Sequence, residues 1–351
     1  MLILGIETSC DETSVALLEH TGGNRLSIRA NLIASQIEAH QLFGGVVPEI
    51  ASRKHLEALT PLLRLVKDET GIEWRDLDLI GVTSGPGLSG ALLVGIASGK
   101  ALSLATRIPL RATNHIAGHI SSTFLENPDL ALPMLCLVVS GGHSDLVLVR
   151  DFSEFERLGR TRDDAVGEGF DKVARAIGLP LPGGPNLERA ARSVAKPALR
   201  FTPANLEPSF DFSFSGLKTA ATQGFAKGKS SPEEIAAAFQ IAAIKQLAKQ
   251  TGRAIEEFRP KTLGLCGGVA ANGALRAKMS SLCAEANIEF VVPAPILCTD
   301  NAAMIGAAAF FDARRAGFPA FRVEDLSFEA RSVWPVSASR GGEGERGRKN
   351  G

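Results

Sequence analysis

Residues 134–149 read MLCLVVSGGHSDLVLV, an apolar run, a short turn of small residues and a second apolar run. The same layout opens the chain, where residues 2–18 read LILGIETSCDETSVALL. Each segment predicts a strand, a tight polar turn and a returning strand, although an ordinary polar hairpin would look the same. Such turns can present backbone N–H groups and hydroxyls to a phosphate. Two of them, one opening each half, predict an internally duplicated α/β nucleotide-binding fold.

The length and composition suit one large domain or two packed domains, and they favour two. Its 351 residues are 45% hydrophobic, and 38 Lys and Arg balance 38 Asp and Glu. This balance argues against binding nucleic acid by bulk charge, but a local patch could still dock RNA. A polar loop at residues 127–129 predicts domains at residues 1–130 and 131–335, and the last helices could pack back on the first domain. Residues 336–351, rich in Ser, Gly, Glu, Arg and Lys, are predicted to be disordered.

The cysteines and the N-terminus indicate a soluble, cytoplasmic protein. The cysteines are scattered and odd in number, without a CxxC pair, as in a reduced chain: Cys10, Cys136, Cys266, Cys283 and Cys298. The first residues lack the basic and then apolar layout of a signal peptide. Lys100 and Arg107 interrupt the longest candidate for a membrane span, so no membrane partner is expected.

Hydrophobic periodicity predicts alternating strands and helices along the chain. Further strands are expected at residues 77–83, 108–113, 262–266 and 289–292, and helices at 48–63, 91–104, 232–258, 273–286 and 302–311. Residues 85–90 match GxGxxG, but no acid follows about twenty residues later, so we expect glycines for close packing rather than a dinucleotide site. The arginine-rich stretch 150–200 is interpreted as a solvated helical face, with an RNA backbone patch as the alternative.

The segment NHIAGH, residues 114–119, contains two histidines at the spacing of one helical turn. On a helix, His115 and His119 would share one face, where a single divalent metal could bind both, although many such pairs are incidental. Asn114 suits an N-cap, and Gly118 would leave one side of the helix bare for a ligand to approach. A zinc protease would need glutamate where Ile116 stands, so the protease alternative weakens.

Further candidate ligand-binding residues lie at turns between predicted strands and helices. Asn272 follows a strand and paired glycines, and its amide can both donate to and accept from a purine or ribose. The Pro-Gly-Gly-Pro turn at residues 182–185 is rigid, and a ligand could approach its bare backbone. Asp300 is the one carboxylate in the loop that opens the last predicted helix.

Five ordered motifs together resemble a known family. They are GIETSCDET at residues 5–13, the histidine pair, SGGH at 140–143, GGVAAN at 267–272 and TDN at 299–301. Over about residues 1–335 the chain resembles the universal tRNA threonylcarbamoyladenosine transferases, once described as sialoglycoprotein endopeptidases. The resemblance implies the fold of actin, sugar kinases and Hsp70 (ASKHA), with two similar domains around a nucleotide cleft.

The resemblance also implies a reaction, a site and partners. Threonylcarbamoyl would pass from threonylcarbamoyl-AMP to N6 of adenosine 37 in tRNAs that read codons starting with A. One divalent metal, Fe2+ or alternatively Zn2+, would be held by His115, His119 and Asp300. The family's substrate contacts match Val138, Val139, Ser140, Gly141, Gly142, Asp171, Gly184 and Asn272. Besides tRNA, the implied partners are an inactive paralogue of the same fold and a small P-loop ATPase.

Two departures from the family pattern are small. Ser144 stands where threonine is usual and keeps the hydroxyl. Ala117 stands where many members have glutamate, so the side chain at this position is not expected to be a metal ligand. These residues favour acyl transfer without a covalent enzyme intermediate, with Asp11 or Glu12 as the candidate proton acceptor. A small-molecule kinase of the same fold would leave the histidine pair unexplained, and a nucleotide-gated scaffold would need no metal ligands.

Overall fold

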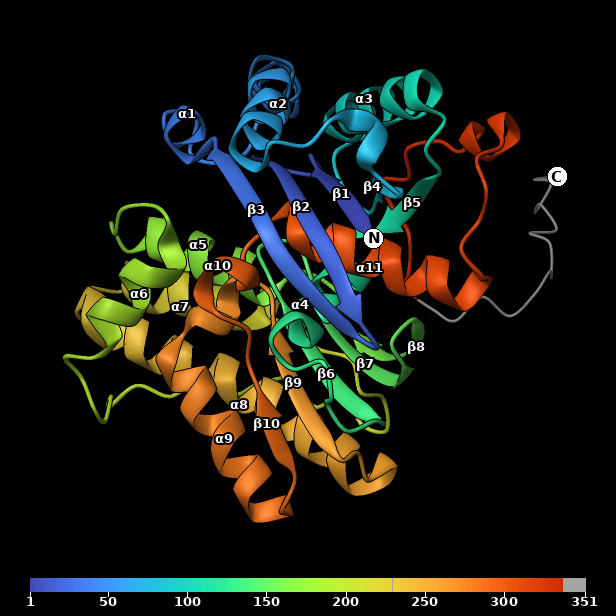
Figure 1. The fold of residues 1–351 in the computed structure, drawn as a ribbon. Helices are drawn as coiled ribbons and strands as arrows, with labels where there is room; N and C mark the ends of the chain where they lie inside the picture. Colours follow the sequence, from blue (N-terminus) through green and yellow to red (C-terminus); the bar gives the residue numbers. More distant parts are fainter. Residues whose placement is uncertain (229, 337–351) are drawn as a thin grey trace, which may run out of the picture.

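The computed structural model describes residues 1–228 and 230–336. It contains two five-stranded sheets, with helices between them and on their outer faces (Figure 1). Residues 337–351, which carry most of the predicted disordered tail, lie outside the described residues. Val336, which the prediction also placed in that tail, is buried against the protein core, so the ordered chain extends at least this far.

The first sheet consists of β1 (Leu2–Glu7), β2 (Glu12–Gly22), β3 (Arg25–Ser35), β4 (Leu79–Gly85) and β5 (Leu110–Asn114), in the order β3-β2-β1-β4-β5. The first three strands form an antiparallel meander, while β4 pairs parallel with β1 and β5 pairs parallel with β4. The central strands are buried along nearly their whole length, because helices cover both faces of the sheet.

The second sheet consists of β6 (Met134–Val139), β7 (Ser144–Asp151), β8 (Glu154–Arg160), β9 (Thr262–Cys266) and β10 (Glu289–Val291). Its order, β10-β9-β6-β7-β8, repeats the first sheet strand for strand when it is read from β8. The parallel and antiparallel pairings are also the same. The predicted duplication of an α/β unit is therefore confirmed.

Two helices, α4 (His115–Glu126) and α11 (Ala302–Ala316), form the layer between the sheets. Helix α11 approaches β1 so closely that a Cβ on Gly5 would lie 2.0 Å from the carbonyl oxygen of Ala302. A Cβ on Gly118 of α4 would lie 2.8 Å from Ile305 Cδ1 of α11. The bare side of Gly118 thus packs against protein, which corrects the expectation that a ligand approaches there.

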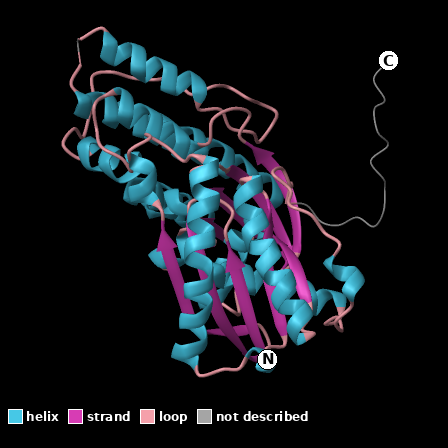
Figure 2. Ribbon diagram, turned by 90° about the horizontal axis from the view of Figure 1, so that it is seen from above, coloured by secondary structure: helices cyan, strands magenta, loops and turns pink. Residues whose placement is uncertain are grey.

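The remaining helices cover the outer faces and the connections of the two sheets (Figures 1 and 2). The first half carries α1 (Ile37–Gln41), α2 (Pro48–Thr70) and α3 (Ser89–Thr106). The second half carries α5 (Val166–Ala176), α6 (Gly183–Ala191), α7 (Ser215–Ala226), α8 (Pro232–Phe258), α9 (Gly273–Ala286) and α10 (Pro295–Cys298). Short 3₁₀ helices lie at Trp74–Asp76, Gly268–Ala271 and Val323–Leu326.

Helix α3 is long and apolar enough, by length and composition alone, to cross a membrane. Its 18 residues have a mean hydropathy of 1.3, and 39% of them are buried inside the protein. Leu92 and Ile96 pack into the core cluster that contains Val82 of β4 and Leu59 of α2. Core helices commonly meet the same length and composition criterion, so α3 is no more than weak evidence for a membrane span.

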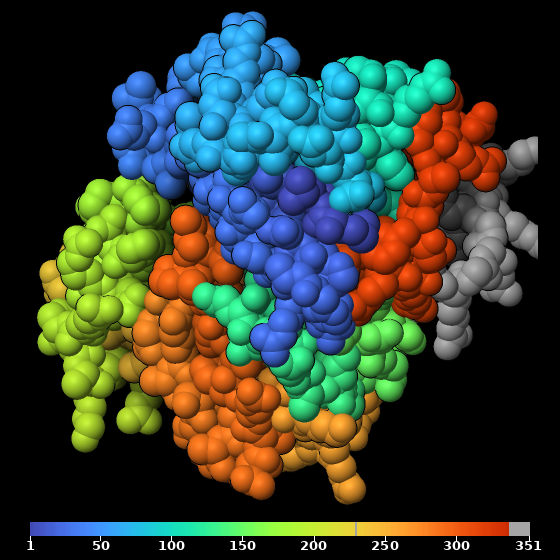
Figure 3. Space-filling view, viewed as in Figure 1, coloured from blue at the N-terminus to red at the C-terminus, as the bar shows by residue number. Residues whose placement is uncertain are grey.

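After α11 the chain remains on the first half of the protein. Residues 331–336, which we call the strap, cross the ends of β4 and β5. Arg331 N donates to Ser84 O at 2.7 Å, and Asn114 Nδ2 donates to Trp334 O at 2.9 Å. Gly85 has φ +153°, and a Cβ there would lie 2.1 Å from Arg331 O. Its lack of a side chain therefore lets the strap pass. In the space-filling view the red C-terminal residues lie against the blue and teal first half (Figure 3).

The other glycines of the 85–90 turn also serve close packing, as predicted. A Cβ on Gly87 would lie 2.6 Å from Ser9 O, and one on Gly90 would lie 2.5 Å from Ser52 Oγ of α2. The turn therefore packs against the first hairpin and a neighbouring helix.

Two edge strands differ from the sequence prediction. The helical interpretation of residues 150–200 is wrong for β8, and β3 was not predicted at all. Both strands are rich in charged or polar residues and pair with one neighbour only, β7 and β2 respectively. Their strand conformation is stabilised by backbone hydrogen bonds to the neighbouring strand. Edge strands commonly carry charged residues and lack a regular alternation of apolar and polar residues, so the sequence pattern did not reveal them.

Candidate functional site

The N-terminus of α4 brings the histidine pair to the centre of the protein. Asn114 is the N-cap, as predicted: its Oδ1 accepts from Ile116 N at 2.9 Å and Ala117 N at 3.1 Å. Both histidines are buried, with His119 fully inaccessible. Their rings lie 4.7 Å apart between centroids.

Asp300 faces both histidines from the start of α11. Its Oδ1 lies 3.5 Å from His115 Nε2 and 3.2 Å from His119 Nε2. One ligand atom of each residue lies within 4.8 Å of the others. Asp300 is held there because Asn301 caps α11, accepting from Met304 N at 3.0 Å. Two helix N-termini thus bring together the three residues predicted as metal ligands.

The environment of His119 fits a metal ion. Both its ring nitrogens are buried without a hydrogen-bond partner among the described residues, because Nε2 is near Asp300 but not aligned for a hydrogen bond. Leaving such a group unsatisfied costs roughly 1–3 kcal/mol. A cation among the three ligand atoms would give Nε2 the partner that it lacks, and two histidines with one carboxylate suit Fe2+ or Zn2+.

Glu7, at the end of β1, orients His115. Its Oε2 lies 3.1 Å from His115 Nδ1 and accepts from Thr83 Oγ1 at 2.7 Å, while its Oε1 accepts from Ser9 N. This bond leaves Nε2 of His115 free to face Asp300, as in carboxylate–histidine–metal arrangements. Sequence reasoning did not select Glu7 as a site residue. The feature of the sequence that could have identified Glu7 is its position as a carboxylate at the end of an apolar, buried strand.

Charge and burial oppose each other in this cluster. Burial would raise the pKa of Glu7, but the charge and hydrogen bond of His115 hold it below its usual value. Burial would lower the pKa of His115, but Asp300 and Glu7 raise it to about 9. The pKa of Asp300 is held well below its usual value despite burial, chiefly by His115 and His119. The arrangement therefore favours ionised carboxylates around a positive centre.

His143 is a second residue that the prediction did not place in the site. Its ring centroid lies 6.1 Å from that of His115. Burial and the neighbouring charges of His115 and His119 lower the pKa of His143 to about 3. It is therefore a neutral imidazole at physiological pH, able to donate or accept one hydrogen bond beside the cluster.

The predicted proton acceptors, Asp11 and Glu12, lie in and after the first hairpin turn. Burial, followed by the charges of Asp11 and Asp300, raises the pKa of Glu12 to about 10. In the metal-free protein Glu12 is consequently protonated at neutral pH and cannot accept a proton. A cation on Asp300 would weaken this repulsion, since it would offset the carboxylate charge.

Four of the eight predicted substrate residues line one cavity of the second half, which we call the donor cavity. Gly141, Asp171, Gly184 and Asn272 all line this space of about 180 Å3. Nothing lies within 4 Å of where a Cβ on Gly141 or Gly184 would be, so a ligand could approach both backbones. Val138 and Val139 are buried in β6 and do not line the donor cavity.

Ser140 and Asn272 use much of their hydrogen-bonding capacity within the protein. Ser140 Oγ accepts from His143 N at 3.1 Å, which fixes the second hairpin turn. Asn272 caps α9, accepting from Leu275 N at 2.9 Å, and donates to Gln240 Oε1 at 2.9 Å. Asn272 therefore helps to hold the wall of the donor cavity in place, besides lining it.

Two carboxylates line the donor cavity. Asp171 Oδ1 accepts from Gly183 N at 2.7 Å, and burial raises its pKa. Glu188, which the prediction missed, accepts from Gly273 N at 3.1 Å. Carboxylates in such a wall can accept hydrogen bonds from ribose hydroxyls, as in other nucleotide sites.

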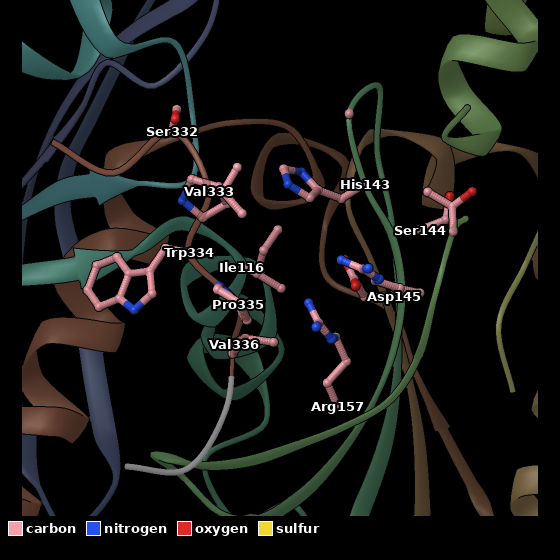
Figure 4. Close-up of a pocket in the computed structure, with 14 residues that line it drawn as sticks. Ile116, His143, Ser144, Asp145, Arg157, Ser332, Val333, Trp334, Pro335 and Val336 are labelled. Carbon is pink, nitrogen blue, oxygen red and sulfur yellow. The ribbon is translucent and has the colours of Figure 1, made fainter. Parts of the chain in front are cut away.

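A second space of about 180 Å3 lies on the other side of the glycine turn, and we call it the strap cavity (Figure 4). Gly142, His143 and Asp145 form one side, and strap residues 332–336 form the other. Burial raises the pKa of Asp145 to about 6, against the opposing charges of Arg157 and Arg160. The two cavities thus meet at the glycine turn, since Gly141 lines the donor cavity and Gly142 lines the strap cavity.

Comparison with known proteins shows the family. A family model described as TsaD, tRNA N6-adenosine threonylcarbamoyltransferase, matches residues 27–307. A tRNA N6-adenosine threonylcarbamoyltransferase of Clostridium botulinum (strain 657 / Type Ba4) is 48% identical over 316 residues, covering 88% of this chain and 92% of the relative. One of Halalkalibacterium halodurans is 49% identical over 314 residues, covering 88% and 90%.

Solved structures support the fold alone. Full-length HypF in a phosphate- and nucleotide-bound form has a TM-score of 0.59 at 14% identity, covering 89% of this chain and 55% of that one. HypF of T. kodakarensis has a TM-score of 0.61 at 15% identity, covering 93% and 49%. The duplicated sheets and these neighbours confirm the predicted ASKHA-type fold. By its family match and its identity to these relatives, the chain belongs to the tRNA N6-adenosine threonylcarbamoyltransferase family and is a transferase enzyme that modifies tRNA.

Proposed function

We propose that this cytoplasmic enzyme transfers threonylcarbamoyl from threonylcarbamoyl-AMP to N6 of adenosine 37 in tRNAs that read ANN codons, with the help of one divalent metal. The observation that carries the proposal is the placement of His115, His119 and Asp300 next to a turn that also lines the donor cavity. Reacting groups held in neighbouring sites gain a large rate advantage over reactants free in solution.

The donor cavity is suited to the AMP part of the donor. Asp171 and Glu188 supply carboxylates for the ribose hydroxyls. Gly141 and Gly184 supply backbone that a phosphate could approach without steric conflict. With AMP bound there, the carbamoyl group would extend past the glycine turn toward His143 and the histidine cluster.

The metal, Fe2+ or alternatively Zn2+, would be held by His115, His119 and Asp300 and would supply Lewis-acid polarisation of the carbamoyl group. Glu7 holds the Nδ1 side of His115, so that Nε2 points into the site. The half-buried, neutral His143 can position the carbamoyl oxygen or nitrogen by one hydrogen bond.

Proton transfer completes the reaction. N6 of the adenine attacks the carbamoyl carbon, the bond to the AMP phosphate oxygen breaks, and one N6 proton must leave. Asp11 or Glu12 would accept that proton. Asp11 is the better candidate, because burial is the largest cause of the raised pKa of Glu12 and would remain when a cation offsets the charge of Asp300.

Partner proteins are part of the proposal: an inactive paralogue of the same fold and a small P-loop ATPase. Leu93 and Leu104 of α3 are 55% and 52% exposed, and Leu56 and Leu65 of α2 are 65% and 45% exposed. Exposed leucines on two packed helices suit a protein interface. We propose this α2/α3 face as the docking surface of the paralogue.

The decisive experiment is threonylcarbamoyl transfer to unmodified tRNA by the chain with its partners and supplied threonylcarbamoyl-AMP. Wild type should form product, and His115→Ala should lose most of that activity. If wild type with every partner forms no product, the assignment of donor and acceptor fails. Assays with ATP and small hydroxylated substrates would then test the kinase alternative.

A further inference from the structure

Two arginines of the strap cavity differ from the other arginines around them. Arg150 pairs with Glu156 at 2.6 Å, and Arg162 pairs with Asp211 at 2.8 Å. Arg157 and Arg160 of β8 line the strap cavity, and their guanidinium groups form no ion pair or hydrogen bond with the described residues. Figure 4 shows Arg157 reaching from β8 into the space between the strap and Asp145.

The balance of charge at this cavity is positive. Asp145 is the one carboxylate among its lining residues, against the two guanidinium groups. A third guanidinium, of Arg331, lies 4.9 Å over the ring of Trp334 at the edge of the strap. Since the whole chain has a formal net charge of zero, this is a local excess rather than a general property of the surface.

The opposite wall offers exposed apolar contact. Val333 of the strap is 77% exposed, and the Trp334 side chain is half-buried beside it. The wall is anchored, because the strap is hydrogen-bonded to Ser84 and Asn114. Arginines without an ion pair that face an exposed aliphatic side chain and a half-buried aromatic one are features with which proteins bind unstacked RNA, because guanidinium groups contact phosphates and apolar or aromatic side chains contact bases.

We propose that the strap cavity and its rim bind the single-stranded RNA loop that carries the target adenosine, with Arg157 and Arg160 contacting its phosphates. The inference rests on the proposed function, because it takes the acceptor to be a tRNA loop. It places the acceptor across the glycine turn from the donor cavity, in the cavity that His143 lines, with the ring centroid of His143 6.1 Å from that of His115.

The carboxylate of the threonyl group is the other anion that these arginines could bind. The exposure of the two arginines favours RNA, because Arg160 is exposed and Arg157 is half-buried. A threonyl carboxylate held next to the buried metal ligands would need a buried arginine as its partner. The adjoining exposed Val333 also extends the surface well beyond the size of an amino acid.

The test compares two double variants that lose the same charge, each assembled with its partners. Arg157→Gln/Arg160→Gln removes the unpaired arginines, and Arg150→Gln/Arg162→Gln removes the paired ones. Binding of unmodified tRNA is measured over a range of salt concentrations, together with the KM for threonylcarbamoyl-AMP. Melting temperatures of all variants establish that they are folded.

The first variant should bind tRNA about tenfold more weakly, and the slope of log K against log salt should fall by about 1.4, that is ~0.7 for each lost phosphate contact. The paired-arginine variant should bind as wild type does, and Arg157→Lys/Arg160→Lys should recover most of the affinity. The KM for the donor should be unchanged.

Three results would overturn the inference. Equal weakening in both glutamine variants would show a general charge effect. A raised donor KM with unchanged tRNA affinity would assign the arginines to the threonyl carboxylate. If both glutamine variants bind tRNA with the affinity of wild type, the RNA binds elsewhere on the protein. A wild-type complex that binds no tRNA at all would instead contradict the proposed function.

Discussion

The two halves of the protein place different residues at equivalent positions of the same strand pattern. Strands β1 and β6 have six residues each, and each pairs antiparallel with the next strand. The first ends in Glu7, which orients a candidate metal ligand, and the second ends in Val139, which is buried and apolar. The turn after Val139 has the glycines that open onto two cavities. The duplicated frame is thus shared, while the chemistry differs at the end of one strand and in one turn.

The helices that follow the two sheets show the same relationship. Both α4 and α11 begin at an asparagine N-cap, Asn114 and Asn301. His115 follows the first cap and Asp300 precedes the second. Because a helix N-terminus stabilises negative charge, Asp300 is favoured as a carboxylate at this place. The candidate metal site is therefore built where two equivalent helices meet, with unlike ligands from each.

Loss of a ligand from the first half should have the largest effect. We expect His119→Ala to lower the rate of tRNA modification by at least about 100-fold and to abolish stoichiometric metal binding, since the residue supplies one of three ligands. Metal analysis of the purified protein, alongside the modification assay, checks this. Asp164→Asn, which disrupts an ion-pair network at Lys172 and Lys218, is the control for general damage. Full metal content in His119→Ala would remove the histidine from the site.

The difference between Glu7 and Val139 can be tested by neutralising the acid. Glu7→Gln should weaken metal affinity or activity by about 10- to 100-fold, because an amide no longer fixes the tautomer of His115 as a carboxylate does. Titration of the apo-protein with Fe2+ or Zn2+ measures the affinity directly. Thr83→Val, which removes only a hydroxyl that donates to Glu7, should have a smaller effect. Equal effects of the two variants would mean that the charge of Glu7 is unimportant.

The division of labour between the halves predicts a variant that affects the donor and spares the metal. Asp171→Asn should raise the KM for threonylcarbamoyl-AMP by roughly tenfold, as expected for one hydrogen bond to a charged group. Metal content should remain that of wild type. A change in metal content without a change in KM would contradict the assignment of nucleotide and metal to separate halves.

The last comparison concerns folding stability. The second half has the buried carboxylate of Asp145 at the position where the first half has Val15. Asp145 pairs with Val138 as Val15 pairs with Ile6. Burial raises the folded-state pKa of Asp145 to about 6 from an ordinary 3.8, so folding stability falls as the pH rises from 3.8 through 6. Asp145→Asn should therefore be more stable than wild type by on the order of 2 kcal/mol above pH 7. Chemical denaturation at several pH values tests this, and an advantage that persists below pH 3.8 would contradict the explanation.

Local pattern was enough to predict much of the frame. The apolar runs of β1 and β6, the helical spans of α8 and α9, and the Asn114 cap were all readable, because each depends on residues close in sequence. The motif spacing also identified the family, which the comparisons confirm. Edge strands β3 and β8 escaped prediction, since their conformation depends on pairing with a distant partner.

Patterns local to the sequence were sufficient to predict the duplicated strand layout and the histidine pair on one helical face. The packing of the folded chain sets which acids face that pair. Glu7 and Asp300 lie 293 residues apart in the chain (300 − 7), yet both reach His115, since β1, α4 and α11 pack in adjacent layers. It also decided that Gly118 serves helix packing and that the strap closes a cavity. Contacts between such distant segments depend on the packing of whole sheets and helices, which no local pattern encodes.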